Sequence, residues 1–458
     1  MIIILTYQDL LEVGESETER MAFVRNAINR HKSEDLYQTA VTAWEYYKHR
    51  NVTIVNFQKL LYTVTGKAVP DNISANYKMA SKFFNRFVTQ ENQYLLGNGA
   101  TWESDDTANK VGNNFDNQLQ KAGKYALIGG VSFGFWNLDH LEVFKVTEFV
   151  PLFDENNGSL RAGVRFWQID ADKPLKATLY EEDGYTEYMW SKRGDGEENG
   201  EVVEEKRAYK QIVRNSAADG EEVVDGENYP GFPIVPLWGN DSHQSELVGL
   251  REQIDCYDLI KSGFANTVDE ASLIYWTLNN AGGMDDVDLT EFIERIKTVH
   301  AATTEDGVQA QPHTIEAPYA SREALLDRLR ADMYEDAMAL DIRSIVGGAN
   351  TATQIKASYE PLDDKCDDYE YEIKQFVQRL LEIAEIDDNA TFTRSQIVNV
   401  AEDIAVLLQS AQYLPEEYVT KKLLTLLGDG DQAETILEQM AADEMARMMS
   451  GNEDLLNE

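Results

Sequence analysis

The chain has 458 residues, enough for roughly two to four compact units, and its hydrophobic fraction of 43% excludes a wholly disordered protein. Its 41 basic and 81 acidic residues give a net charge of −40. Tight binding to nucleic acid or to an anionic membrane needs a basic surface, so this balance argues against both.

The two cysteines, Cys256 and Cys366, lie far apart, which excludes a disulfide framework and a zinc site with closely spaced ligands. The apolar run from Met1 to Leu5 is too short for a signal peptide. No window approaches the roughly 18 apolar residues of a membrane span. We therefore expect a protein made in the cytosol and without a membrane segment.

Residues 1 to about 125 are predicted to be mainly helical. A helix opens near Glu15, and a second apolar face repeats at helical spacing from Leu36 to Tyr47. An aromatic helix follows and ends at Gly97-Asn98-Gly99. Its buried face is expected to hold Tyr77, Phe83, Phe84, Phe87, Val88, Tyr94 and Leu95.

From about 125 to 240 the pattern changes to short β-type segments separated by turns such as Asp183-Gly184, which is typical of antiparallel hairpins. The segments are 143–146, 164–167, 177–180 and 185–188. The acidic stretches 194–205 and 219–227 are predicted to be loops.

The longest periodic segment runs from Ser245 to Leu278 without proline, which predicts a helix about 50 Å long. Its apolar residues, here called the seam, are Leu247, Leu250, Ile254, Tyr257, Phe264, Val268, Ala271, Tyr275 and Leu278. Their spacing suits packing along other long helices. The alternative is a helical hairpin packed inside a monomeric domain.

The remainder is again mainly helical, so the predicted fold class is α+β with a majority of helix. Pro361 is expected to bend or break one of these helices. The predicted elements are a helix over 288–301, a strand over 308–315, helices over 321–339 and 353–386, a strand over 391–394, and helices broken near 413–415 and 428–430.

Motifs for chemistry are weak. Gly129–Gly134 lacks the Lys-Ser/Thr of a phosphate loop and predicts a strand with close backbone packing. Asp285–Asp288 lacks the glycine and terminal glutamate of a calcium loop. The six histidines form no metal pair at helical spacing. We expect no enzyme activity, no cofactor and no metal.

Several segments from residue 230 onward occur in an order that resembles one protein family. They are Leu250-Arg251-Glu252-Gln253-Ile254-Asp255-Cys256-Tyr257-Asp258, Ser262-Gly263-Phe264-Ala265-Asn266, Leu325 to Tyr334, Gly348 to Lys356, and Phe392-Thr393-Arg394 with Asn399 and Glu402. Together they resemble the portal proteins of long-tailed, siphophage-type bacteriophages that infect Gram-positive bacteria. The stretch 348–356 departs from that family's usual glycine- and serine-containing box.

The resemblance implies the phage portal fold, with long stem helices and an antiparallel, β-rich wing. The implied parts are a wing (1–240), a first stem helix (241–278), a clip (279–319), a second stem helix (320–338), a tunnel loop (339–352), a long wing helix with a wing strand (353–400) and a crown (401–458).

The implied function is a subunit of a twelve-membered ring, the head–tail connector at one capsid vertex. Double-stranded DNA would pass through it non-specifically during packaging and ejection. The implied partners are the large terminase, a head–tail adaptor, and the major capsid and scaffold proteins. The ring would assemble in the cytoplasm of the bacterial host and remain in the virion.

Three groups of site residues follow from the resemblance and the seam. The DNA-facing tunnel loop is Ile342, Arg343, Ser344, Ile345, Val346, Gly347, Gly348, Ala349, Asn350 and Thr351. The stem contacts between copies are Leu247, Leu250, Ile254, Tyr257, Phe264, Val268, Leu325 and Leu329. The clip residues that dock partners are Phe292, Arg295, Lys297 and His300. Arg343 either contacts phosphate or pairs with an acid such as Asp341.

Two other functions stay open at this stage. One is an acidic carbohydrate-active hydrolase, whose aromatic groove would hold Trp136, Trp167, Trp190 and Tyr180. Because these aromatics alternate in strand-like segments, core packing explains them more simply. The other is a different large scaffold protein with long helices.

Overall fold

The computed structural model describes most of the chain. The described residues are 5–62, 66–71, 74–192, 198–215, 222–271, 275–279, 309–313, 319–343, 352–395, 400–427, 433, 435–437 and 439–440. They divide into two compact units. Unit 1 comprises Met1–Ala339 and Lys365–Thr393, and unit 2 comprises Leu340–Asp364 and Arg394–Glu458. Helices and antiparallel sheets occur together, so the fold is α+β, as the sequence predicts.

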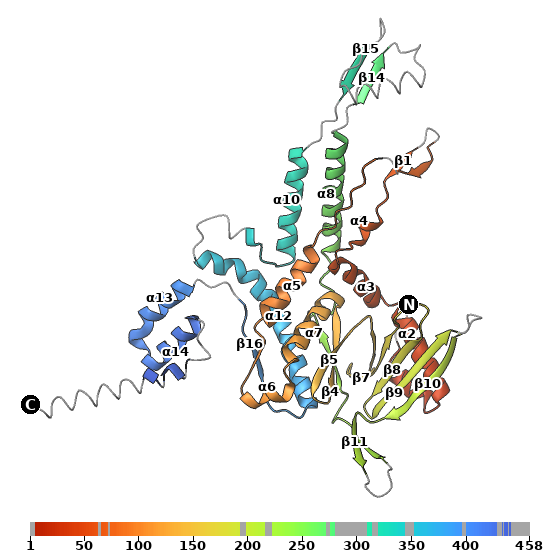
Figure 1. Cartoon of the computed structure of the whole chain (residues 1–458), viewed down its shortest axis with the longest axis vertical. Coiled ribbons are helices and arrows are strands. Elements are labelled where there is room, and N and C mark those ends of the chain that lie inside the picture. Colours follow the sequence, from red (N-terminus) through yellow and green to blue (C-terminus); the bar gives the residue numbers. More distant parts are fainter. Residues whose placement is uncertain are drawn as a thin grey trace, which may run out of the picture. The chain divides into compact units, whose positions relative to one another are not determined.

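A five-stranded antiparallel sheet in unit 1 has the order β10-β9-β8-β7-β6 (Figure 1). Its strands are β6 (Phe149–Phe153), β7 (Leu160–Trp167), β8 (Leu175–Glu181), β9 (Gly184–Lys192) and β10 (Glu198–Arg207). Helices α1 (Tyr7–Val13) and α2 (Glu17–His31) pack on it, and the fully buried Val24 and Ile28 join the apolar residues of the sheet in one core cluster.

A second sheet in unit 1 has the order β13-β4-β5. Its strands are β4 (Val131–Asn137), β5 (His140–Lys145) and β13 (Ile234–Trp238). The rings of Phe133 on β4 and Phe149 on β6 have centroids 4.5 Å apart and link the two sheets.

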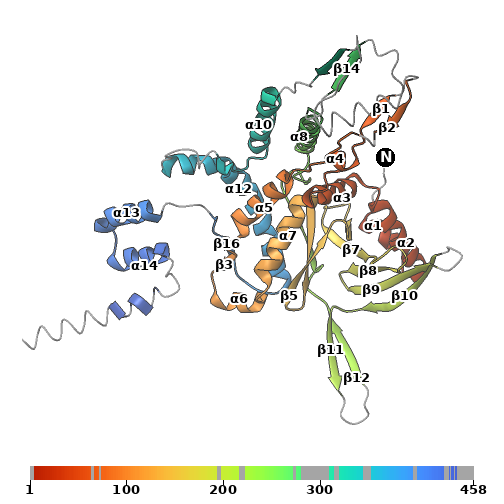
Figure 2. The same cartoon turned by 45° about the horizontal axis from the view of Figure 1, so that its top comes forward.

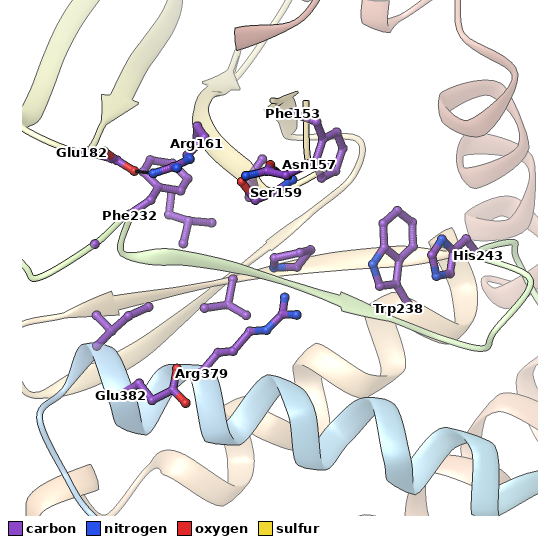
Figure 3. A pocket seen from close by; sticks show the side chains of 17 residues that line it. Phe153, Asn157, Ser159, Arg161, Glu182, Phe232, Trp238, His243, Arg379 and Glu382 are labelled. Atoms are coloured by element: carbon purple, nitrogen blue, oxygen red, sulfur yellow. Dashed lines mark hydrogen bonds and ion pairs between the residues drawn. The ribbon is translucent and has the colours of Figure 1, made fainter. Parts of the chain in front are cut away.

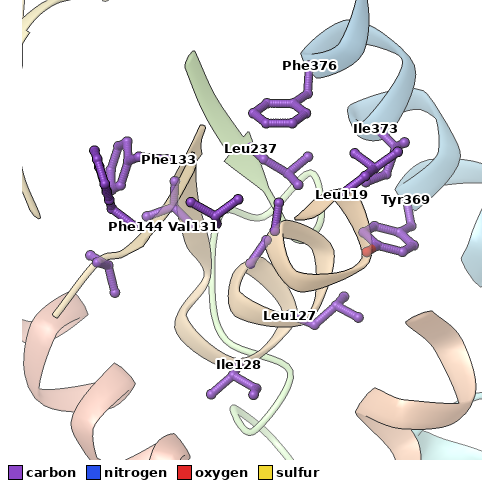
Figure 4. Packing of buried hydrophobic residues seen from close by; sticks show 14 of the residues in the cluster. Leu119, Leu127, Ile128, Val131, Phe133, Phe144, Leu237, Tyr369, Ile373 and Phe376 are labelled. Atoms are coloured by element: carbon purple, nitrogen blue, oxygen red, sulfur yellow. The ribbon is translucent and has the colours of Figure 1, made fainter. Parts of the chain in front are cut away.

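Helices enclose the core of the three-stranded sheet. They are α3 (Asp35–Tyr47), α5 (Phe83–Leu96), α7 (Phe115–Gly129) and the C-terminal part of α12 (Ala352–Ile383). Figure 4 shows Leu119 of α7, Leu237 of β13 and Phe376 of α12 gathered in this core. Gly134 on β4 leaves room for the Phe376 ring, because a Cβ at this position would overlap it. The prediction of a strand with close backbone packing is therefore confirmed.

Short elements complete unit 1. Three two-stranded sheets, β1–β2, β11–β12 and β14–β15, each pair only within themselves, and Figure 2 shows the β11–β12 hairpin extending from the body of the unit. Their strands are β1 (Leu60–Tyr62), β2 (Ala68–Pro70), β11 (Lys210–Asn215), β12 (Glu222–Glu227), β14 (Tyr275–Asn279) and β15 (Gln309–His313). The remaining elements are α4 (Val52–Asn56), α6 (Asp105–Val111), and the paired strands β3 (Ala100–Trp102) and β16 (Ala390–Phe392).

Two long helices, α8 (Arg251–Ala271) and α10 (Tyr319–Asp336), pack together (Figure 1). The predicted helix from Ser245 to Leu278 is therefore too long at both ends. At about 1.5 Å per residue, the 21 residues of α8 span about 32 Å. The sequence beyond it is rich in β-forming aromatic residues, and Tyr275 pairs with His313 in β14–β15.

Unit 2 contains α13 (Val400–Ser410), the short 3-10 helix η1 (Ala411–Tyr413) and α14 (Glu416–Leu427), and the predicted interruption before Pro415 is confirmed. The N-terminal part of α12 also belongs to unit 2. Pro361 does not break α12, since the helix continues for another six turns beyond it.

Three local predictions are wrong. The acidic stretches 194–205 and 219–227 contain strands β10 and β12. Their polar side chains are compatible with strands because β10 is an edge strand and β12 lies in a hairpin. Tyr77 lies in extended chain before α5, where it contacts α8 instead of the aromatic core.

Candidate functional site

The α8–α10 pair is the element that the resemblance assigns to the ring, and its two helices meet along one face of α8. Near one end the rings of Phe264 and Tyr319 have centroids 5.6 Å apart. The guanidinium of Arg322 donates to Thr267 Oγ1 at 2.7 Å. Near the other end the amide of Gln253 donates to the carboxylate of Asp336. These contacts hold α10 along the length of α8.

A different face of α8 carries three polar residues at four-residue spacing, here called the ladder: Asp258, Ser262 and Asn266. Each accepts a hydrogen bond from a backbone N–H of an extended segment near residue 80. Ser81 donates to Asp258 Oδ1 at 2.9 Å. Met79 donates to Ser262 Oγ at 3.0 Å, and Tyr77 donates to Asn266 Oδ1 at 2.7 Å.

The ladder works because two repeat distances match. Four residues of an α-helix rise about 6 Å, and two residues of extended chain rise about 6.6 Å. Polar residues at every fourth position of α8 therefore meet every second backbone N–H of a chain running antiparallel to it. All three ladder residues are buried, so each bond joins a backbone donor to a buried acceptor.

Two further residues extend this contact. Asp255, one turn before the ladder, accepts from Tyr46 Oη at 2.6 Å and from Thr53 Oγ1 at 2.7 Å. The buried amide of Asn51 donates to the carboxylate of Asp258 and to the carbonyl of Ser81. Burial raises the pKa of Asp258, although the hydrogen bonds from Asn51 and Ser81 act against that rise. Residues 51 and 81 are thus both fixed to α8.

A buried ion triad lies where α12, α5 and the loop before α8 meet. Lys365 Nζ lies 2.8 Å from Glu91 Oε2 and 2.6 Å from Glu246 Oε2. It also donates to the carbonyl of Ala337, just after α10, at 3.3 Å. Burial raises the pKa of Glu91 to about 7 against the opposing effect of Lys365. Burial alone would lower the pKa of Lys365, but the two carboxylates raise it. The triad therefore joins the bases of both long helices to the core.

An open pocket of about 890 Å³ lies among β13, the β6–β7 hairpin and α12 (Figure 3). At one end the rings of Trp238 and His243 stack with centroids 3.9 Å apart. At the other, Arg161 pairs with Glu182. These contacts pair two of the charged side chains and two of the ring side chains in the pocket lining.

The aromatic groove expected for a hydrolase does not form. Trp136, Trp190 and Tyr180 are buried in the cores of unit 1. Trp167 is 37% exposed and lies against the Arg165 guanidinium. Core packing therefore explains Trp136, Trp190 and Tyr180.

The predicted stem contacts between copies divide into three sets. Leu247, Leu250 and Ile254 are at most 5% exposed and belong to the core of unit 1, so they leave little surface for another copy, and their contact with one stays a prediction. The chain itself covers this end of the seam, because α8 begins beside α3 and α7 rather than in solvent.

Two seam residues make ring contacts within the chain. The ring centroid of Tyr257 lies 5.0 Å from that of Phe83, and Phe264 packs on Tyr319. Leu329 is partly buried. Val268 on α8 and Leu325 on α10 are each 46% exposed and remain available to a partner.

The other predicted site residues are described only in part. Ile342 and Arg343 are exposed, and the backbone N–H of Arg343 donates to Asp341 Oδ1 at 3.1 Å. The remaining predicted tunnel-loop residues, 344–351, lie outside the described residues, as do Phe292, Arg295, Lys297 and His300.

In the part of the chain that the structure describes, no three His, Cys, Asp or Glu residues gather in a way that could hold a metal ion. No helix within the same residues is both long and apolar enough to cross a membrane.

Sequence reasoning missed the ladder, although its signal was visible. The prediction for this helix was based on its apolar seam. Asp258, Ser262 and Asn266 are small polar residues at four-residue spacing, which places them on one face of a helix. They also lie within the two segments that resemble portal sequences. What the sequence did not reveal was the partner, because the extended segment has no periodicity of its own.

The family described as "Phage portal protein, SPP1 Gp6-like" matches residues 27–445. A portal protein of Bacillus phage SPP1 is 23% identical over 432 residues, which cover 87% of this chain and 81% of the relative. A portal protein of Clostridium phage phiCD119 is 25% identical over 211 residues. That match covers 44% of this chain and 47% of the relative, so it spans about half the length of the Clostridium phage protein.

Two solved structures are also similar. The neck of an empty gene transfer agent particle has a TM-score of 0.44 at 11% identity, covering 76% of this chain and 90% of that one. A chain of the virion of a native gene transfer agent particle has a TM-score of 0.45 at 12% identity, and the match covers 75% of this chain and 89% of that one.

Proposed function

The chain belongs to the SPP1 Gp6-like family of phage portal proteins, and from this membership we propose that it forms a ring through which double-stranded DNA enters and leaves the head. As a portal protein it is a structural component of the phage particle and not an enzyme. The family match over residues 27–445 carries the proposal, because it includes both long helices and the segments on either side of them.

The parts of the ring subunit are proposed with boundaries adjusted to the observed elements. The stem consists of α8 and α10, and the clip lies between them, from β14 to β15 and the residues they enclose. The wing comprises residues 1–240 together with the C-terminal half of α12 and β16. The tunnel loop is 339–352, and the crown is 401–458.

The proposed action on DNA is passive. Each tight phosphate contact would have to break as the DNA advances, so a channel for a polyanion functions best with weak contacts. A chain of net charge −40 supplies a lining that repels phosphate and keeps the duplex hydrated. Arg343 in the tunnel loop, with an exposed side chain, is the proposed site of weak phosphate contact.

The proposed partners act at different parts of the subunit. The clip docks the large terminase while the head is filled, and ATP hydrolysis by the terminase supplies the work. A head–tail adaptor docks on the clip afterwards. The major capsid and scaffold proteins contact the wing and crown. Twelve copies form the ring at one capsid vertex, and the ring assembles in the bacterial cytoplasm.

Particle size tests the ring itself. Twelve copies of 51.9 kDa give about 620 kDa, and electron micrographs should show rings with a central hole. A purified protein that stays at the mass of one chain at every concentration would contradict the proposal.

A deletion tests the tunnel loop. Removing Arg343 to Gly348 should leave ring assembly intact and stop DNA filling of heads. Deleting four of residues 216–221, which leaves two residues to join β11 to β12, serves as the control. Normally filled heads from the first deletion would show that this segment does not act on DNA.

A further inference from the structure

We propose that residues 51–81, here called the arm, form one side of the contact between adjacent copies, and that the arm packs against the exposed rim of α8 and α10 in the next copy. This inference rests on the proposed ring. It adds a surface that neither the seam nor the family resemblance identified.

The first argument is placement. The α8 residues that contact α10, Gln253, Phe264 and Thr267, cluster on one side of a helix with about 100° per residue. The ladder lies on the opposite side, turned by roughly 170°. The arm and α10 therefore flank α8 on opposite sides, and both cartoons show the order α10, α8, α4 (Figures 1 and 2). A ring contact joins two different faces of the subunit, and this arrangement provides two.

The second argument is exposed apolar surface on both faces. On the arm, Phe57, Leu60 and Tyr77 are 40%, 45% and 52% exposed. On the opposite rim, Val268 and Leu325 are each 46% exposed. The backbone of the arm is nevertheless anchored at both ends by Asn51 and the ladder. A segment held this firmly while presenting large apolar side chains to solvent is suited to binding another surface.

The third argument is charge, and it identifies the occupant. The arm carries Lys59, Lys67 and Lys78 against the single acid Asp71, a net charge of +2 in a chain of −40. The two long helices are acidic: apart from Asp255 and Asp258, which bind their own copy, α8 has three acidic and two basic residues, and α10 has five acidic and three basic. A second copy of this chain thus offers the arm a surface of opposite charge, and the pairing offsets part of the repulsion between acidic subunits.

The fourth argument is the hairpin at the tip of the arm. Strands β1 and β2 pair only with each other in the described part of the chain. A two-stranded sheet is marginally stable alone in water. Contact with a neighbouring copy supplies the missing support.

The test compares matched variants of the full chain. Phe57→Glu with Leu60→Glu should raise the protein concentration at which rings dissociate by at least tenfold, measured by mass photometry during dilution. Circular dichroism should show an unchanged fold. Ile169→Glu alters a residue that is 89% exposed away from the stem and should change that concentration less than twofold. Rings as stable as wild type in the arm variant would overturn the inference.

Cross-linking checks the partner surface directly. In a Cys256→Ser background, rings mixed from Leu60→Cys and Leu325→Cys subunits should yield covalent dimers with a short bismaleimide, and rings of either variant alone should not. If rings form normally but cross-link only when Leu60→Cys subunits are mixed with Ile169→Cys subunits, the arm contacts the region of Ile169 in the next copy and not α10, which would contradict the inference. A wild-type chain that forms no rings would instead contradict the proposed function.

DNA is the competing occupant of a basic segment. Lys59→Glu with Lys67→Glu should destabilise rings without changing their retention of a short DNA duplex at equal ring concentration. Intact ring stability with lost duplex retention would assign the arm to DNA and overturn the inference.

Discussion

Lys365 Nζ on α12 lies 2.8 Å from Glu91 Oε2 on α5, and both side chains are largely or fully withdrawn from solvent. Glu246, from the loop before α8, completes the triad at 2.6 Å. One cation thus holds two carboxylates, and the site carries a net negative charge inside the protein. Because the same ammonium reaches the carbonyl of Ala337, the triad fixes the start of α8 and the end of α10 to the core of unit 1.

Lys365→Met should destabilise the folded chain by about 3–5 kcal/mol, because it leaves two carboxylates buried without a cation. The measurement is urea unfolding followed by tryptophan fluorescence. Lys374→Met is the matched control on the same helix: its pair with Glu370 is half exposed, so the cost should stay below about 1 kcal/mol. Equal losses in the two variants would contradict a structural role for the triad.

The triad also predicts a pH dependence. The pKa of Glu91 is raised to about 7 in the folded chain from an ordinary value of 4.5, so the folded state binds more protons between these values. The stability from this group is complete below pH 4.5 and is lost as pH rises through 7. Glu91→Gln removes that loss.

The free energy of unfolding of Glu91→Gln, relative to wild type, should therefore rise by about 2 kcal/mol between pH 5.5 and 8. Urea titrations at four pH values would measure the change. Glu370→Gln should show no such trend, since its carboxylate pairs with Lys374 at the surface. A flat difference for Glu91→Gln would mean that Glu91 is already ionised in the folded chain at pH 5.5.

The ladder predicts an alternating pattern of hydrogen exchange. The backbone N–H groups of Tyr77, Met79 and Ser81 should exchange slowly, because each donates to a buried acceptor, whereas those of Lys78 and Ala80 should exchange faster. Mass spectrometry with residue-resolving fragmentation can separate them.

Removing one acceptor sharpens this prediction. Ser262→Ala should speed exchange at Met79 and cost about 1–3 kcal/mol, because a buried donor loses its partner. Ser321→Ala on exposed α10 should leave both quantities unchanged. Uniform exchange across residues 77–81 in wild type would contradict the ladder.

Most regular elements could be predicted from local patterns. The helix around Leu36–Tyr47 and the strands at 143–146, 164–167, 177–180 and 185–188 all form. The failures involve partners distant in sequence. Tyr275–Asn279 shows helical apolar spacing, but it pairs with Gln309–His313, and no local signal indicates a contact across thirty residues.

The candidate site shows the same limit. The spacing of Asp258, Ser262 and Asn266 was readable, but the segment that they hold was not. The seam shows a related limit at Leu247, Leu250 and Ile254, which this chain itself buries. An apolar face indicates burial without indicating whether this chain or another copy covers it. The assignment to the portal family therefore rests on the family match over residues 27–445, and not on the seam.

Two glycines should respond to alanine in opposite directions. At Gly123 on α7, a Cβ would overlap the hydroxyl of the buried Tyr369, which donates to Asn92 Oδ1 at 2.9 Å. Gly123→Ala should therefore push α12 from α7 and cost about 1–3 kcal/mol. At Gly263 on α8 a Cβ meets nothing within 4 Å, so Gly263→Ala should stabilise by about 0.5–1 kcal/mol through the lower entropy of the unfolded chain. Urea midpoints at constant slope report both changes. If Gly123→Ala left the midpoint unchanged or raised it, the close contact between α7 and α12 at Gly123 would be wrong.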